Sequence, residues 1–97
     1  MKNINLNKYG PIISSKTVGE EIFSVLNKGL VESAKITVDL SEIKSMATFC
    51  AKQIFGRLYI QLGSEKFFEK IILKGADNDL KTIIQIGIQH ALKERTK

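Results

Sequence analysis

Carboxyl and hydroxyl side chains gather in one short stretch of this chain. Asp39 ends a β-branched run, and Ser41, Ser45 and Thr48 follow it before an amphipathic helix begins. The free N–H groups at a helix start, together with the positive end of its dipole, favour anions and phosphorylated side chains. This stretch is therefore where the sequence predicts a functional site.

Thr48 has two candidate roles at the start of that helix. As an N-cap it would accept a hydrogen bond from a first-turn amide, which stabilises a helix by about 1 kcal/mol. As a phosphoacceptor it would gain about two negative charges, which Lys44 and Lys52 could complement. The cap is the favoured interpretation. Ser45 is a second phosphoacceptor candidate, although a serine there could equally form a turn.

The elements that position these residues alternate between strands and helices. Apolar periodicity and β-branched runs predict strands near 3–7, 12–13, 35–40 and 68–73. Helices are expected from about Ser15 to Gly29, from Thr48 to Leu62, and from Leu80 to Leu92. The order β-β-α-β-α-β-α predicts an α/β domain with a mixed, mostly parallel sheet of about four strands and helices packed over it.

The predicted topology places the site at one edge of the sheet. Right-handed crossovers would set the strand at 35–40 beside the strand at 68–73. The loop 41–47 then leaves from the carboxyl end of a strand, where functional surfaces of such sheets usually lie. Phe67 and Phe68 are expected at the start of the second of these strands, with one ring inward and one outward near Tyr59.

Composition indicates one ordered domain spanning residues 1–97. The chain has 97 residues, of which 43% are hydrophobic, enough for one core without staples. Its single cysteine, Cys50, cannot form an intrachain disulfide, and the polar N-terminus does not resemble a secretory signal, so a cytoplasmic location is expected. No apolar run has the length of a membrane span.

The net charge of +5 comes from dispersed residues. Lysines are spread along the chain, and only Arg57 and Arg95 are arginines, the residue most used in specific phosphate and base contacts. A solvated lysine-rich surface is favoured over a nucleic-acid interface. No phosphate loop, metal-ligand cluster or nucleophile–base set is recognisable, so an enzyme, a cofactor and a metal are not expected.

Several short motifs resemble the STAS domains, and more closely the small bacterial STAS-like family of unknown function. They are Gly10, Ile13, Ser15-Lys16, Val38-Asp39-Leu40-Ser41, Ile43, Met46 and Thr48-Phe49. Anti-sigma factor antagonists of the STAS group place Asp-Ser-Ser-Gly at the helix start, where a serine accepts phosphate. This chain has Ala47-Thr48-Phe49-Cys50 there, so only Thr48 keeps a hydroxyl.

The resemblance implies a non-enzymatic regulatory module that binds a protein partner, such as a histidine-kinase-like ATPase of the anti-sigma type. The loop 41–47 and the start of the helix 48–62 would make the contact. The expected contact residues are Asp39, Ser41, Lys44, Ser45, Thr48, Phe49 and Lys52. The alternatives are a constitutive structural subunit, simplest as a homodimer, and a nucleic-acid-binding protein that uses the dispersed lysines.

Overall fold

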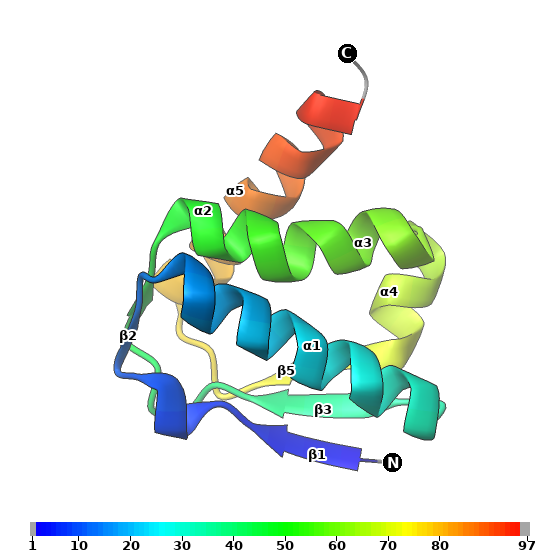
Figure 1. Cartoon of the computed structure of the whole chain (residues 1–97), viewed down its shortest axis with the longest axis horizontal. Helices are drawn as coiled ribbons and strands as arrows, with labels where there is room; N and C mark the ends of the chain where they lie inside the picture. The colour runs from blue at the N-terminus through cyan, green and yellow to red at the C-terminus, as the bar shows by residue number, and fades with distance from the viewer. Residues whose placement is uncertain (1, 96–97) are drawn as a thin grey trace.

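A three-stranded parallel sheet lies at the base of the fold (Figure 1). The structure, a computed structural model, describes residues 2–95. The strands β1 (Lys2–Asn5), β3 (Ile36–Asp39) and β5 (Ile71–Lys74) are arranged in the order β1-β3-β5. The predicted pairing of the strands near 35–40 and 68–73 is confirmed, because β3 pairs with β5 in parallel.

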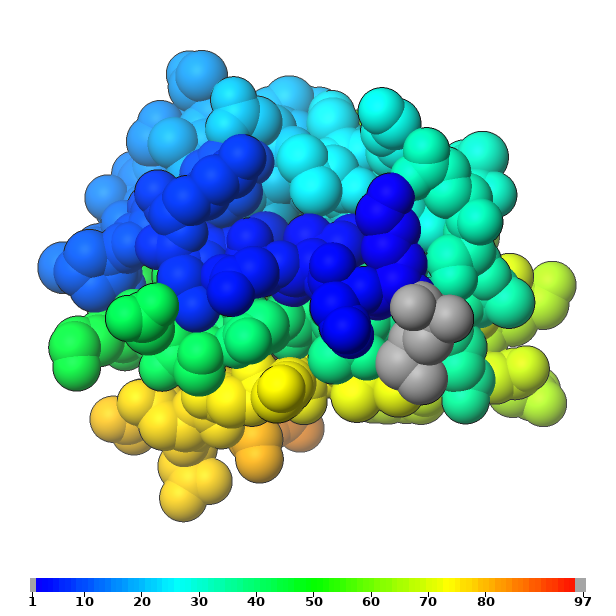
Figure 2. All heavy atoms as spheres, turned by 90° about the horizontal axis from the view of Figure 1, so that it is seen from below, coloured from blue at the N-terminus to red at the C-terminus, as the bar shows by residue number. Residues whose placement is uncertain are grey.

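The two faces of this sheet carry different side chains. Ile4, Ile36, Val38 and Ile71 are buried on the face toward the helices. The opposite face carries exposed or half-buried residues, namely Asn3, Asn5, Thr37, Asp39, Ile72 and Lys74. Seen from below, the segments that contain the three strands lie side by side (Figure 2). The core therefore lies between the apolar face of the sheet and the helices above it.

A separate pair of short strands joins two distant segments. β2 (Ile12–Ile13) and β4 (Ser45–Met46) are parallel, with Ile12 opposite Ser45. The prediction that 41–47 is a loop throughout is therefore wrong at 45–46, where two residues are too few to show a strand pattern. Among the described residues the strands form a sheet of three and a pair, all parallel, instead of one mixed sheet of about four.

Helix α1 (Lys16–Glu32) begins directly after Ser15, where its start was expected. The Ser15 hydroxyl accepts a hydrogen bond from the Val18 amide at 3.4 Å. The helix continues past Gly29, which was expected to end it. Gly29 is instead a packing position, because a β-carbon there would lie 2.7 Å from Cδ1 of Ile4.

Residues 48–62 form one continuous helical segment, here called the central helix. It consists of α2 (Thr48–Ala51), a π-helical turn (Lys52–Gly56) and α3 (Arg57–Leu62). It ends at Gly63, whose φ of +85° favours glycine, as predicted. The π turn was not predicted. It coincides with close packing against α5 (Asn78–Arg95), because a β-carbon at Gly87 would lie 2.6 Å from the Lys52 nitrogen.

The segment before β5 is a helix, which corrects the predicted strand start at 68. Phe67 and Phe68 lie on α4 (Ser64–Lys70), and β5 begins only at Ile71. The two rings do split, since Phe67 is buried and Phe68 is 68% exposed. The Phe68 ring contacts Tyr59 with ring centroids 6.1 Å apart.

Helix α5 begins at Asn78, two residues before the expected Leu80, within the cluster Asp77-Asn78-Asp79. Asp77 Oδ1 accepts a hydrogen bond from the Leu80 amide at 2.8 Å and so caps the first turn. The C-terminal half of α5 rises away from the sheet beside the central helix (Figure 1). Among residues 2–95, no helix has the length and apolar character that a membrane crossing requires.

Candidate functional site

Asp39 organises the turn that follows β3. Its Oδ1 accepts a hydrogen bond from the Ser41 amide at 2.9 Å. Hydrogen bonds from the amide and then the side chain of Ser41 lower the pKa of Asp39 below its ordinary value of 3.8. The Asp39 carboxylate therefore accepts a hydrogen bond from the loop that follows β3.

Asn7 holds the same turn from the other side, and sequence reasoning did not find it. Its Oδ1 accepts from the Glu42 amide at 3.0 Å, and its Nδ2 donates to Ser41 Oγ at 3.4 Å. An Asn in an alternating polar and apolar run gives no sign of such a long-range contact. Asp39 and Asn7 together fix the backbone at the first residues of the loop.

Backbone hydrogen bonds fix the remainder of this segment. The amides of Lys44 and Ser45 donate to the Pro11 carbonyl at 2.8 and 3.2 Å, and the Ala47 amide donates to the Ile13 carbonyl at 2.8 Å. The residues 41–47 therefore present a formed surface. Ile12, directly opposite Ser45, is 61% exposed on it.

Thr48 does not cap the central helix, so the favoured interpretation of this residue is wrong. The N-cap is Ala47, and no side chain bonds the first-turn amides. Ala47 supplies its carbonyl to the amides of Cys50 and Ala51 at 2.9 and 3.1 Å. Thr48 occupies the first helical position, where its half-buried side chain is not needed for capping.

The charged and aromatic contact candidates lie in different surroundings. Phe49 is 44% exposed on the first turn of the central helix. Lys44 is exposed, whereas Lys52 is half-buried and forms an ion pair with Glu94 of α5. Of these two lysines, only Lys44 has an ammonium that no ion pair among residues 2–95 engages.

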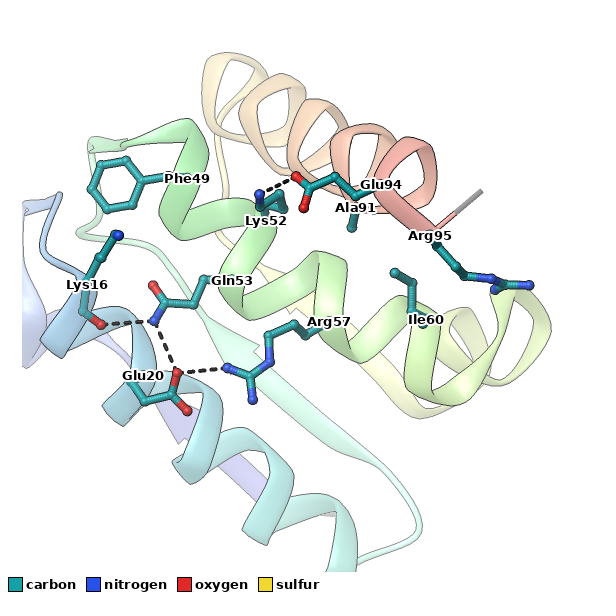
Figure 3. Close-up of a pocket in the computed structure, with 10 residues that line it drawn as sticks. All are labelled: Lys16, Glu20, Phe49, Lys52, Gln53, Arg57, Ile60, Ala91, Glu94 and Arg95. Carbon is teal, nitrogen blue, oxygen red and sulfur yellow. Dashed lines mark hydrogen bonds and ion pairs between the residues drawn. The ribbon is translucent and has the colours of Figure 1, made fainter. Parts of the chain in front are cut away.

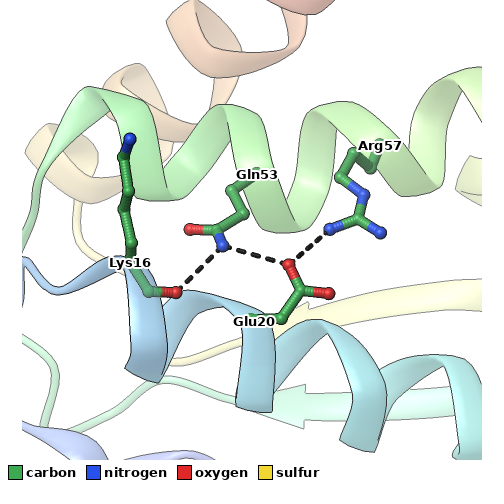
Figure 4. Close-up of polar contacts among 4 residues, drawn as sticks. All are labelled: Lys16, Glu20, Gln53 and Arg57. Atoms are coloured by element: carbon green, nitrogen blue, oxygen red, sulfur yellow. Dashed lines mark hydrogen bonds and ion pairs between the residues drawn. The ribbon is translucent and has the colours of Figure 1, made fainter.

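A polar network connects α1 with the central helix (Figure 4). Gln53 Nε2 donates to the Lys16 carbonyl at 3.0 Å and to Glu20 Oε1 at 3.2 Å. Arg57 Nη1 donates to the same Glu20 oxygen at 2.8 Å, and its guanidinium stacks 3.7 Å from the centroid of the Phe23 ring. Hydrogen bonds from Gln53 and then Arg57 lower the pKa of Glu20 below its ordinary value of 4.5.

A groove of about 820 Å³ runs along the outer side of the central helix (Figure 3). Residues of α1 and α5 line its sides, and the central helix lines it with a stripe of apolar and polar side chains. The lining residues are Lys16, Glu20, Phe49, Lys52, Gln53, Arg57, Ile60, Ala91, Glu94 and Arg95. Phe49 therefore belongs both to this groove and to the helix start beside the segment 41–47.

Cys50 lies beneath this surface. Burial raises the pKa of its thiol, and Sγ donates to the Ser15 carbonyl at 3.5 Å. The thiol thus connects the starts of α1 and the central helix. Among residues 2–95, no group of three or more His, Cys, Asp or Glu is placed to hold a metal ion.

Residues 18–81 match the family described as STAS-like domain of unknown function (DUF4325). The chain belongs to this STAS-like family. The match in this STAS-like domain extends from α1 to the first turn of α5 and includes Asp39, the segment 41–47 and the whole central helix. The likeness at Gly10, Ile13 and Ser15-Lys16 lies outside the matched residues. No curated protein and no solved structure is significantly similar to the chain.

Two groups of residues around the candidate site were not predicted from the sequence. Gln53 is half-buried and Arg57 is exposed, and both contact α1 through Glu20. Their spacing of four places them on one helix face, which is the only local signal. Asn7 and Pro11 act through contacts with residues far along the chain, which one sequence does not indicate.

Proposed function

We propose that this STAS-like domain is a non-enzymatic regulatory module that binds a protein partner. The contact comprises the segment 41–47 and the first turn of the central helix. Its residues are the seven expected from the sequence: Asp39, Ser41, Lys44, Ser45, Thr48, Phe49 and Lys52.

The observation that carries this proposal is the exposure of Phe49 next to a segment that is already ordered. A large aromatic ring 44% exposed on a helix exposes apolar area, and aromatic anchors dominate protein interfaces. Ile12, 61% exposed, adds a second apolar side chain on the adjacent strand pair. A surface held by Asn7 and Pro11 needs little ordering on binding, which lowers the entropic cost of association.

The chemistry of Asp39 also favours binding over catalysis. A lowered pKa keeps this carboxylate ionised near neutral pH, and its oxygen is engaged by the Ser41 amide. A general acid needs a raised pKa and a free position toward a substrate. Asp39 instead has the properties of a structural acceptor that shapes the loop.

The resemblance to anti-sigma factor antagonists suggests the partner's class, a histidine-kinase-like ATPase. Thr48 would then carry the switch. Phosphate at the first helical position adds about two charges where the helix dipole favours them, and Lys44 is the nearby exposed cation. A dianion inside an apolar contact would repel a partner that seats Phe49.

The experiment compares binding of one partner to matched variants. The full chain is immobilised, proteins of the native host are captured, and the recovered partner is identified by mass spectrometry and purified. Its affinity is then measured for the wild type, for Phe49→Ala with Lys44→Glu, and for the control Val31→Ala. Val31 is an apolar residue 83% exposed at the other end of α1. We expect about tenfold weaker binding for the double variant only; equal affinity for all three proteins contradicts the proposal.

A constitutive homodimer is the second candidate, and one observation favours it. Phe68 and Ile72 are 68% and 38% exposed on α4 and the edge strand β5, away from the segment 41–47. Light scattering that gives a dimer mass for the wild type and a monomer mass for Phe68→Ala would support this candidate. A dimer unaffected by Phe49→Ala would place the assembly outside the proposed contact.

A further inference from the structure

The groove along the central helix has the dimensions of a site for another helix. Its apolar and polar lining from Phe49 to Ile60 follows twelve residues of the central helix, whose eleven steps correspond to about 16 Å. That length matches about three turns of a helical peptide. Phe49, Ile60 and Ala91 supply apolar contacts along it.

The backbone groups around the groove favour a helical occupant over an extended peptide. Every residue that lines the groove lies on a helix, so most N–H and C=O groups around it are used within helices and no strand edge among residues 2–95 faces it. An extended peptide would find no ladder of partners there and would leave its own backbone groups unpaired. A helix satisfies its own backbone and offers only a side-chain stripe to such a groove.

The charges of the groove determine the character of its occupant. Four cationic residues line it, Lys16, Lys52, Arg57 and Arg95, against two acids. Glu20 already pairs with Arg57, and Glu94 with Lys52. No ion pair among residues 2–95 engages the ammonium of Lys16 or the guanidinium of Arg95, which lie near opposite ends of the groove in Figure 3. The occupant that complements this arrangement carries acidic residues beside its apolar stripe.

We propose that this groove binds an acidic amphipathic helix of a protein partner. The inference deepens the proposed function and rests on it, because Phe49 and Lys52 belong to both surfaces. A second copy of this chain complements the groove poorly, since its own net charge is +5. The helix would lay its apolar residues on Phe49, Ile60 and Ala91 and its carboxylates toward Lys16 and Arg95.

The test uses a displayed library of helical peptides of about 14 residues, with a fixed apolar stripe and flanking positions randomised among Asp, Glu, Gln and Lys. Selection on the full wild-type chain should enrich peptides with net negative charge. Their affinity should fall about tenfold for Lys16→Glu with Arg95→Glu. The matched control, Lys28→Glu with Lys81→Glu, changes the charge of α1 and α5 equally and leaves the groove intact, so its affinity should equal that of the wild type.

Three results would overturn the inference. The first is enrichment of neutral or basic peptides, or of none. The second is an equal loss of peptide affinity in both double variants, which would mean that the positive charge of the whole domain attracts the peptides and that no defined groove binds them. The third is a dimer in light scattering that Lys16→Glu with Arg95→Glu dissociates, which would make a second copy the occupant. If the native partner is lost with Phe49→Ala and Lys44→Glu but retained by Lys16→Glu with Arg95→Glu, the proposed function stands and only the groove inference fails.

Discussion

The amide oxygen of Gln53 occupies the space that a side chain at position 19 would need. A β-carbon built on Gly19 would lie 2.1 Å from Gln53 Oε1. The amide nitrogen of the same side chain donates hydrogen bonds to the Lys16 carbonyl and the Glu20 carboxylate. Gly19 therefore permits the contact through which α1 and the central helix are joined beside the groove.

Gly19→Ala should lower the free energy of unfolding by about 1–3 kcal/mol, because the new methyl group displaces the Gln53 amide. Urea denaturation of the variant and the wild type measures this loss. The control is Ser24→Ala, at an exposed position of the same helix, which should stay within about 0.5 kcal/mol of the wild type. In a Gln53→Ala background the cost of Gly19→Ala should shrink, and an unchanged cost would contradict the assigned clash.

The pKa of Glu20 should depend on both Gln53 and Arg57. It lies below its ordinary 4.5 because of the hydrogen bond from Gln53, then the hydrogen bond from Arg57, and also the positive charge of Arg57. A carboxylate with a lowered folded-state pKa stabilises the fold above its unfolded pKa, and this stabilisation is lost as the pH falls through the folded value. NMR titration should show that Gln53→Ala and Arg57→Ala each raise the Glu20 pKa toward 4.5, because each variant removes a group that lowers it. An unchanged pKa in either variant would contradict the assigned contact.

Ser15 and Thr48 begin two neighbouring helices and should differ in their contribution to stability. Ser15→Ala should lower the free energy of unfolding by about 1 kcal/mol, because it removes the bond to the Val18 amide. Thr48→Ala should cost less than about 0.5 kcal/mol, since Thr48 caps nothing. Thermal or urea denaturation of both variants checks the difference. A similar loss for both would restore the capping role of Thr48.

Charge at Thr48 should weaken partner binding while loss of the hydroxyl should not. Thr48→Glu places a carboxylate beside Phe49, so the affinity for the purified partner should fall about tenfold. Thr48→Ala provides the matched control and should bind as the wild type does. Titration calorimetry of both variants measures the two affinities. Equal binding would reject the switch and leave the contact surface itself in place.

Much of the fold could be predicted because its signals are local. Periodic apolar residues located α1, the central helix and α5, and the structure places the caps of α1 and α5 at Ser15 and Asp77, at or near the expected helix starts. The strand β4 could not be predicted, because Ser45 and Met46 gain their partner from Ile12 and Ile13, far away in sequence. The start of β5 was placed too early, because Phe67 and Phe68 at the end of α4 are apolar like Ile71 to Leu73, and the two intervening charged residues do not mark a boundary by their period.

The position of the candidate site could be predicted from the sequence, but most contacts of its residues could not. The hydrogen bond from Ser41 to Asp39 spans two residues, so its signal is in the sequence. The contacts of Gln53 with Glu20 and of Lys52 with Glu94 depend on how helices pack. The π turn likewise depends on tertiary packing, at Gly87 against the Lys52 backbone.

The strand pair β2–β4 links the two proposed binding surfaces structurally. Ile13 leads directly into α1 and Met46 into the central helix, and the Ala47 amide and the Cys50 thiol connect these two starts. A partner that displaces β4 would also move the floor of the groove relative to its α1 side. Occupancy of the segment 41–47 would then alter the affinity of the groove, and the reverse effect would have equal magnitude.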